Sequence, residues 1–245
     1  MEHVECGATP AAEQAAHGPA AYAVRAALFD VDGTLTDTNH LHVVSWWEAF
    51  RQAGHDITMH AVHQALGLPG PDLLVRLLGP GHDQEEKDAI STAHDVLYAT
   101  YFERITAIPR AGDLLHALAS DGWRIVLVTS ASGEELSALR RAIDADDALH
   151  ATTSADDVEH GKPHPEPVCR ALELAGALPG RAVFVGDSVW DMEAGRRASV
   201  NWCVGLLCGG IPAADLQAAG ADAVHEDPAE LLHALGTSPF ARIPA

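Results

Sequence analysis

Two aspartates separated by a single residue, Asp30 and Asp32, stand near the start of the chain. The apolar run Ala26–Val31 predicts a buried strand, and Gly33 directly after the pair permits a sharp turn. Where a strand ends and the chain turns, both carboxyl groups can reach the same mouth of a site. One carboxylate can then attack an electrophile while the other moves a proton, although an isolated Asp-x-Asp pair can also do no more than cap a turn.

Three later segments carry polar side chains at the ends of apolar runs or in a stiff loop, and they strengthen this interpretation. They are Val126–Ser130, Gly161–Pro165 and Val183–Asp191. Together with the first run they resemble, in the same order, the four motifs of the haloacid dehalogenase-like superfamily. The resemblance extends from Ala26 to about Leu207. It implies a phosphatase, related to the β-phosphoglucomutase-like members, that works through an aspartyl phosphate.

The resemblance makes Asp30 the nucleophile, which splits one difficult displacement into two easier ones by taking up the phosphoryl group. Asp32 would protonate the leaving alcohol and then deprotonate the water that hydrolyses the intermediate. Asp32 also bears on the class of reaction, because dehalogenases of this superfamily resemble the pattern without an acid at that position. The acid at residue 32 therefore favours a phosphatase over a dehalogenase.

Thr129 and Lys162 complete the predicted catalytic set. The Thr129 hydroxyl, with a neighbouring backbone N–H, can hold a phosphoryl oxygen, and Ser130 is the competing choice for this substrate contact. The Lys162 ammonium would bind the phosphoryl oxygens and neutralise charge on them and on Asp30 in the transition state. The chain has only one other lysine, Lys87, which makes a random surface role for Lys162 less plausible.

The last of these segments adds two more carboxylates, Asp187 and Asp191. Several carboxylates packed together are costly unless a cation neutralises them. The resemblance assigns Mg²⁺ to Asp187, Asp30 and the main-chain carbonyl of Asp32, all of them oxygen ligands of the kind this ion prefers. Asp191 is predicted to bind the ion or to orient its water ligands; the alternative is a charge that complements a helix N-terminus.

Predicted strands alternate with predicted helices over most of the chain, which indicates an α/β fold: a doubly wound, Rossmann-like parallel sheet. The expected strands are Ala26–Val31, Ile125–Thr129, His150–Thr153, Ala182–Val185, Asn201–Leu206 and Ala223–His225. The expected helices between the later strands are Gly133–Ile143, Glu166–Ala175, Asp191–Ala198, Ala213–Ala219 and Ala229–Leu235. Ligands of such sheets bind at the carboxyl ends of the strands, where the four motifs fall.

One stretch interrupts this alternation and predicts an inserted α-helical cap domain. Its expected helices are Asn39–Ala53, Thr58–Leu66, Pro71–Leu78 and Gln84–Ile105. We therefore expect a flexible tail at residues 1–22, a core domain at 23–37 and 107–245, and the cap at 38–106. Hinges near Thr36–Thr38 and Ile108–Gly112 would let the cap close over the site.

His42, just past the first motif, opens a second reading. The segment resembles β-phosphoglucomutase-like members, in which a histidine at the matching place helps to manage the acid/base aspartate and contacts substrate. Those mutases also carry an arginine in a cap loop that grips a second phosphate. The matching loop here is Leu66–Pro71, and no basic residue follows it until Arg76. An ordinary surface histidine is the alternative.

Composition limits the classes of partner. The net charge of −20, from 15 basic and 35 acidic residues, disfavours binding to nucleic acid or to an anionic membrane. No apolar stretch approaches the roughly 20 residues of a membrane helix, and the start of the chain lacks the basic, apolar pattern of a secretory signal. Four cysteines show no metal-binding spacing and are expected to be free thiols in a reducing cytoplasm: Cys6, Cys169, Cys203 and Cys208.

These inferences converge on a Mg²⁺-dependent hydrolase of a small phosphate monoester, such as a sugar phosphate or similar metabolite. A phosphosugar mutase is the alternative within enzymes. A non-catalytic binding protein on the same fold is the alternative outside them, and the intact set of acids and lysine argues against it. The sequence indicates neither the particular ester nor an oligomeric state.

Overall fold

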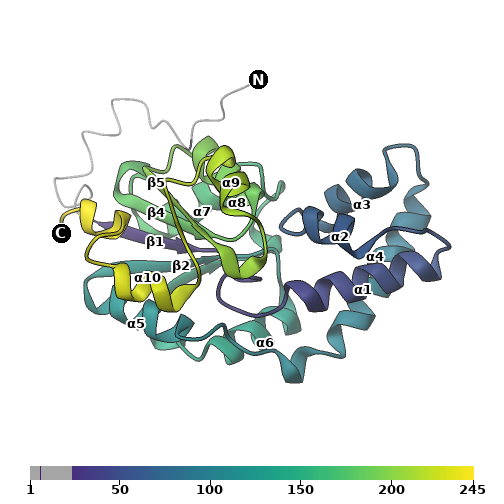
Figure 1. Ribbon diagram of the computed structural model, residues 1–245, viewed down its shortest axis with the longest axis horizontal. Coiled ribbons are helices and arrows are strands. Elements are labelled where there is room, and N and C mark those ends of the chain that lie inside the picture. Colours follow the sequence, from purple (N-terminus) through teal and green to yellow (C-terminus); the bar gives the residue numbers. More distant parts are fainter. Residues whose placement is uncertain (1–5, 7–23) are drawn as a thin grey trace.

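The computed structural model describes Cys6 and residues 24–245, and at its centre lies a six-stranded parallel sheet (Figure 1). The strand order is β3-β2-β1-β4-β5-β6, so the connections change direction between β1 and β4. The strands are β1 (Arg25–Phe29), β2 (Trp123–Val128), β3 (Leu149–Thr153), β4 (Ala182–Gly186), β5 (Trp202–Leu206) and β6 (Ala223–His225). Such a change of direction leaves a crevice at the carboxyl ends of the two central strands.

All six predicted strands are present, with ends within two residues of those expected. Every residue of β1 and of β4 is buried, as expected for parallel strands covered on both faces. The first strand ends earlier than predicted because the chain turns at Val31. The backbone N–H groups of Leu35 and Thr36 both donate to the Val31 carbonyl, which therefore belongs to the turn.

Helices cover both faces of the sheet, so the predicted doubly wound fold is confirmed. One face carries α5 (Ala111–Ser120), α6 (Gly133–Ile143) and α10 (Pro228–Ala234). The other carries α7 (Glu166–Ala175), α8 (Val189–Arg197) and α9 (Ala213–Ala219). Short 3-10 helices lie at η3 (Asp146–Ala148), η4 (Ala155–Asp157), η5 (Pro179–Arg181), η6 (Leu207–Gly209) and η7 (Pro239–Arg242).

Helix α5 was not predicted, because Pro109 and Gly112 suggested a hinge where the helix in fact begins. Gly112 has a packing role in α5: a Cβ there would lie 2.9 Å from the backbone oxygen of Ile143. Leu114, Leu115 and Leu118 of the same helix are buried against the sheet.

Four helices between β1 and α5 form the cap: α1 (Asn39–Gln52), α2 (Met59–Ala65), α3 (Gly70–Leu78) and α4 (Gln84–Ala99). They pack around a separate apolar cluster that includes Trp46, Phe50 and Ile90. The last helix was predicted to reach Ile105 but ends at Ala99. The Thr100 hydroxyl donates to the Leu97 carbonyl, and the chain continues as the 3-10 helix η2 (Phe102–Arg104). The predicted domain boundaries stay predictions.

The two connections between core and cap run side by side. Thr36 pairs with Ala107 in an antiparallel bridge, and the Asp37 N–H donates to the Thr106 carbonyl at 3.0 Å. The Ile108 N–H donates to the Leu35 carbonyl at 2.9 Å. The two predicted hinge segments therefore lie side by side where the chain leaves and re-enters the core. This arrangement would allow the cap to close by rotation about a single axis.

The prediction of four free thiols was wrong for two cysteines. Cys6 and Cys169 form a disulfide, with Cα atoms 5.2 Å apart, whereas Cys203 and Cys208 are free. The pairing joins residues 163 positions apart, so it depends on the tertiary fold and sequence spacing could not show it. Apart from Cys6, the predicted flexible tail lies outside the described residues. None of the helices described is long and apolar enough to cross a membrane.

The central position of β1 leads to a test of the core. Leu28 is fully buried in the middle of the sheet, whereas Leu178 is 45% exposed. We expect Leu28→Ala to lower the free energy of unfolding by about 2–5 kcal/mol, because it leaves a cavity that the rigid sheet cannot fill. Leu178→Ala, the matched control, should cost less than about 1 kcal/mol. Urea unfolding measures both, and equal effects would contradict this description of the core.

Candidate active site

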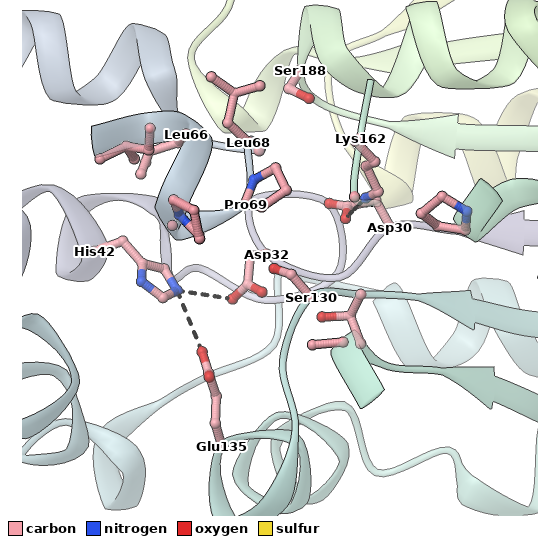
Figure 2. A pocket seen from close by; sticks show the side chains of 18 of the residues that line it. Asp30, Asp32, His42, Leu66, Leu68, Pro69, Ser130, Glu135, Lys162 and Ser188 are labelled. Atoms are coloured by element: carbon pink, nitrogen blue, oxygen red, sulfur yellow. Dashed lines mark hydrogen bonds and ion pairs between the residues drawn. The ribbon is translucent and has the colours of Figure 1, made fainter. Parts of the chain in front are cut away.

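The motif residues meet at the carboxyl ends of the central strands, on a cavity of about 370 Å³ between core and cap. Asp30 follows β1, Thr129 follows β2 and Asp187 follows β4, while Lys162 comes from the loop before α7. The cap contributes residues of α1, α4 and the connection between α2 and α3. Figure 2 shows the labelled core side chains facing those of the cap across this space.

Asp30 is buried at the centre of the cluster. One of its oxygens is in close contact with the Lys162 ammonium, and the other lies 3.1 Å from the Thr34 hydroxyl. Burial raises the pKa of Asp30 to about 7, and the neighbouring carboxylates of Asp191 and Asp32 add to the rise while Lys162 opposes it. At neutral pH Asp30 is therefore only partly ionised, and Lys162 favours its ionised form.

Asp187 is held by two side-chain donors. The Thr34 hydroxyl lies 3.0 Å from Asp187 Oδ1, so its single proton serves both this carboxylate and Asp30. The Asn39 amide donates to Asp187 Oδ2 at 2.8 Å. Burial raises the pKa of Asp187 well above its usual range, and the charges of Asp30 and Asp191 raise it further.

Asp191 has two roles in the structure. It is the third residue of α8 and forms a capping box with Ser188, whose N–H and hydroxyl both donate to Asp191 Oδ2. Its other oxygen lies 2.8 Å from the Lys162 ammonium. Asp191 therefore lies at a helix N-terminus, as the alternative interpretation expected, and it also lies beside Asp30 and Asp187.

Lys162 is 7% exposed and lies between Asp30 and Asp191. Burial alone would lower the pKa of this ammonium, but the two carboxylates raise it above its usual value. Lys162 is therefore charged at neutral pH. Its ammonium is also 5.7 Å from the centre of the Phe184 ring.

Asp32 belongs to a second group of side chains, at the boundary with the cap. His42 Nε2 lies 3.4 Å from Asp32 Oδ1 and 3.8 Å from Glu135 Oε1, as the dashed lines of Figure 2 show. Burial alone would raise the pKa of Asp32, but His42 and the Thr38 hydroxyl, 2.6 Å away, lower it below its usual value. Burial alone would lower the pKa of His42, but Asp32 and Glu135 raise it.

Glu135 and His94 were not predicted as site residues. Burial raises the pKa of Glu135 to about 7, with a further rise from the nearby charge of Asp32. His94 Nε2 lies 3.2 Å from His42 Nδ1, and the His94 ring stacks on Trp46 with centroids 4.0 Å apart. Both residues reach the cavity only through tertiary packing. Asn39 was also missed, although its place in the polar run after the first motif was a usable signal.

Thr129 and Ser130 both line the cavity. Thr129 is buried, and its hydroxyl accepts a hydrogen bond from the Ala131 N–H at 3.0 Å, which orders the turn after β2. Ser130 is exposed to the cavity. Their predicted contact with a phosphoryl oxygen stays a prediction.

The donor set fits a hard divalent cation. Asp30, Asp187 and Asp191 each offer an oxygen, and these atoms lie within 4.8 Å of one another. Lys162 alone does not balance three buried carboxylates, and burial together with their mutual repulsion raises the pKa of Asp30 and Asp187. Oxygen-only ligands suit Mg²⁺ better than softer metals. The carboxylate of Asp32 faces His42, so its predicted metal contact would use only the main-chain oxygen.

Comparison with known proteins agrees with this fold. A family model for haloacid dehalogenase-like hydrolases matches residues 24–199, and the chain belongs to this family. A hydrolase from Pseudomonas syringae is 32% identical, with a TM-score of 0.81, over 86% of this chain and 97% of that one. CbbY from Rhodobacter sphaeroides, solved with phosphate, is 26% identical, with a TM-score of 0.68, over 85% and 96%.

A curated relative adds a named activity. Pyrophosphatase PpaX from Oceanobacillus iheyensis is 29% identical over 187 residues, which are 73% of this chain and 81% of that one. Together with the family match, this similarity identifies the chain as a hydrolase of the phosphatase type. The name of the relative describes that protein's substrate alone.

The excess of negative charge leads to a stability test. The folded state raises the pKa of Asp187. In the metal-free protein this carboxyl group therefore lowers the free energy of unfolding at every pH above its pKa in the unfolded chain. Asp187→Asn removes this cost, and its amide oxygen can still accept from Asn39. We expect Asp187→Asn to raise the free energy of unfolding at pH 8. The gain should disappear as the pH falls through about 4, where the unfolded carboxyl also becomes protonated.

Urea unfolding at several pH values in chelator measures this effect. Asp88→Asn, which removes an exposed carboxylate of α4, is the matched control and should change little. A loss of stability on Asp187→Asn at pH 8 would show that the carboxylate is already neutralised within the protein.

Proposed function

We propose that the protein hydrolyses a small phosphate monoester in a Mg²⁺-dependent reaction, through a phosphoryl group carried on Asp30. The observation that carries the proposal is the group of three buried carboxylates around one lysine at the carboxyl ends of β1 and β4. Such a group is costly to keep unless it binds a cation and a reacting anion.

The proposed reaction uses two carboxylates in sequence. Asp30 attacks the phosphorus atom while Lys162 offsets charge on the phosphoryl oxygens, with Thr129 and Ser130 as further oxygen contacts. Asp32 is ionised in the free protein, so it relays to the leaving alcohol a proton from the protonated His42, whose Nε2 lies 3.4 Å away. Asp32 then takes a proton from the water that attacks the phosphorylated Asp30 and returns it to His42, so the protein ends as it began.

The cation has a limited part in this scheme. Asp30, Asp187 and the main-chain oxygen of Asp32 would hold Mg²⁺, and Asp191 would hold it or orient its water. When bound, it neutralises charge on the phosphoryl oxygens and places the phosphorus atom in line with the nucleophile. The phosphate bound to the CbbY relative and the pyrophosphatase activity named for PpaX support phosphorus chemistry in this fold.

One observation favours a mutase as the second candidate, namely the position of His42 against Asp32. The lining of the cavity opposes it. The Leu66–Pro71 connection lines the cavity without a cation, and Arg76 beyond it stacks on Trp190, with the guanidinium 5.0 Å from the ring centre. A mutase has to grip a second phosphate, so we favour hydrolysis. Retention of the acids and of Lys162 opposes a binding protein without catalysis.

We also propose a cytoplasmic location with a small phosphorylated metabolite as the partner. The free thiols Cys203 and Cys208 support it, whereas the Cys6–Cys169 disulfide is of a kind more common in oxidising compartments.

The nucleophile can be tested directly. Asp30→Asn should lower kcat for a chromogenic phosphate ester by at least about 10³, because the covalent route is removed. Asp88→Asn, the same change on the surface, should keep near wild-type activity. Excess chelator should silence the wild type and Mg²⁺ should restore it. Near wild-type turnover by Asp30→Asn, or full activity in chelator, would disprove this mechanism.

A separate experiment distinguishes hydrolysis of a sugar phosphate from transfer of its phosphoryl group to another position of the sugar. With β-glucose 1-phosphate and a bisphosphate primer, we expect free phosphate to form faster than the 6-phosphate. The reason is that the cavity lining described here offers no arginine for a second phosphate. Coupled assays for the two products measure both rates, and faster formation of the 6-phosphate would reverse the assignment.

A further inference from the structure

The place of the leaving group follows from the proposed function, on which this inference rests. A phosphoryl group on Asp30 and Lys162 puts the leaving oxygen at Asp32, the proposed acid. The side chains directly beyond Asp32 are His42 and Glu135, and the nearest ligand atoms of these three residues lie within 4.8 Å of one another. The leaving group must therefore extend into the part of the cavity that His42 and Glu135 line (Figure 2).

This leaving-group region is negatively charged. Glu135 and Asp95 line the cavity, and the charge of Asp95 acts on both Glu135 and His42. His42 can offset part of the charge, but its Nε2 already faces the carboxylates of both Asp32 and Glu135. The region therefore keeps an excess of carboxylates over cations.

In the described lining, side chains with a permanent positive charge occur only at the opposite end of the cavity, where the phosphoryl group would bind. In the lining of the cavity as described, Lys162 is the one lysine, arginine is absent, and Lys162 is already shared by Asp30 and Asp191. A Mg²⁺ ion on the three buried carboxylates would add positive charge at this phosphoryl end only. With Mg²⁺, the three carboxylates and Lys162 would balance, so the formal charge falls from about zero at the phosphoryl end to negative in the leaving-group region.

The opposite wall of the leaving-group region is apolar. Leu66, Leu68 and Pro69 line it from the connection between α2 and α3, as Figure 2 shows. A short alkyl chain can pack on this wall while a polar or cationic end faces Glu135. Volume sets a limit as well, because a cavity of about 370 Å³ holds only a small molecule.

We propose that this site selects small phosphate monoesters whose leaving group carries an amine, and that it rejects leaving groups with a second anionic group. Amino-alcohol phosphates are the favoured class, and neutral alcohol phosphates come next. Pyrophosphate, bisphosphates and phosphorylated carboxylic acids are disfavoured. This preference would separate the chain from its pyrophosphatase relative, since like charges placed together exclude the wrong ligand.

Three esters of nearly equal size form a charge series that tests the proposal. They are the phosphate monoesters of ethanolamine, ethylene glycol and glycolic acid, with a cationic, a neutral and an anionic end. We expect kcat/KM, measured by released phosphate with Mg²⁺ at about pH 8, to fall in that order. The cationic and anionic esters should differ by at least about tenfold.

Variants locate the cause of the preference. Glu135→Gln should reduce the ratio of kcat/KM between the cationic and anionic esters by about fivefold or more. Glu134→Gln, the same change at the exposed neighbouring position, should leave the ratio as in the wild type. Competition of each ester with a chromogenic phosphate on the wild-type enzyme repeats the test without any variant.

The possible failures are distinguishable. Hydrolysis of the chromogenic ester with an anionic ester preferred over the cationic one would overturn this inference and leave the proposed function standing. An unchanged ratio in a folded, active Glu135→Gln variant would also overturn it. Inactivity toward every ester in the presence of Mg²⁺ would overturn the proposed function and the inference together.

Discussion

Three buried carboxylates that share one lysine are the constraint on which the rest of the structure depends. Asp30, Asp187 and Asp191 are buried close together and repel one another, and Lys162 offsets only part of that charge. Hydroxyl and amide donors also contact these carboxylates. Thr34 serves two of the carboxylates with one hydroxyl, and the third, Asp191, is tied into the first turn of α8.

The close packing around this cluster explains why glycine stands at positions 33 and 209. A Cβ on Gly209 would overlap the Asp187 carboxylate, and one on Gly33 would overlap both Asp187 and Asn39. Asn39 is the first residue of α1 and donates to Asp187 and to the Gly209 carbonyl. The first cap helix is thus anchored on the carboxylate cluster, while its next turn brings His42 to Asp32. A cap that moves on its two paired connections would change the surroundings of both aspartates together.

Sequence and structure agree where chemistry depends on the end of a strand. Asp30, Thr129 and Asp187 could be placed because each follows a buried apolar run, and parallel strands bring such ends to one edge. Glu135 and His94 could not be placed, because one stands in the core helix α6 and the other in the cap helix α4, and no local pattern encodes how core and cap meet. The same reason hid the partnership of Cys6 and Cys169. Helix α5 was missed because Gly112 signals a loop by its type, whereas its role is close packing on Ile143.

The central claim is that Asp30 itself takes up the phosphoryl group, and chemical trapping tests it most directly. The protein is mixed with a phosphate ester and Mg²⁺, quenched in acid within one turnover, reduced with borohydride and digested for mass spectrometry. Reduction converts an acyl phosphate of aspartate to homoserine. The account predicts homoserine at residue 30 alone, and only when ester was present. Active enzyme with unmodified Asp30 under these conditions, or with homoserine at another aspartate, would contradict it.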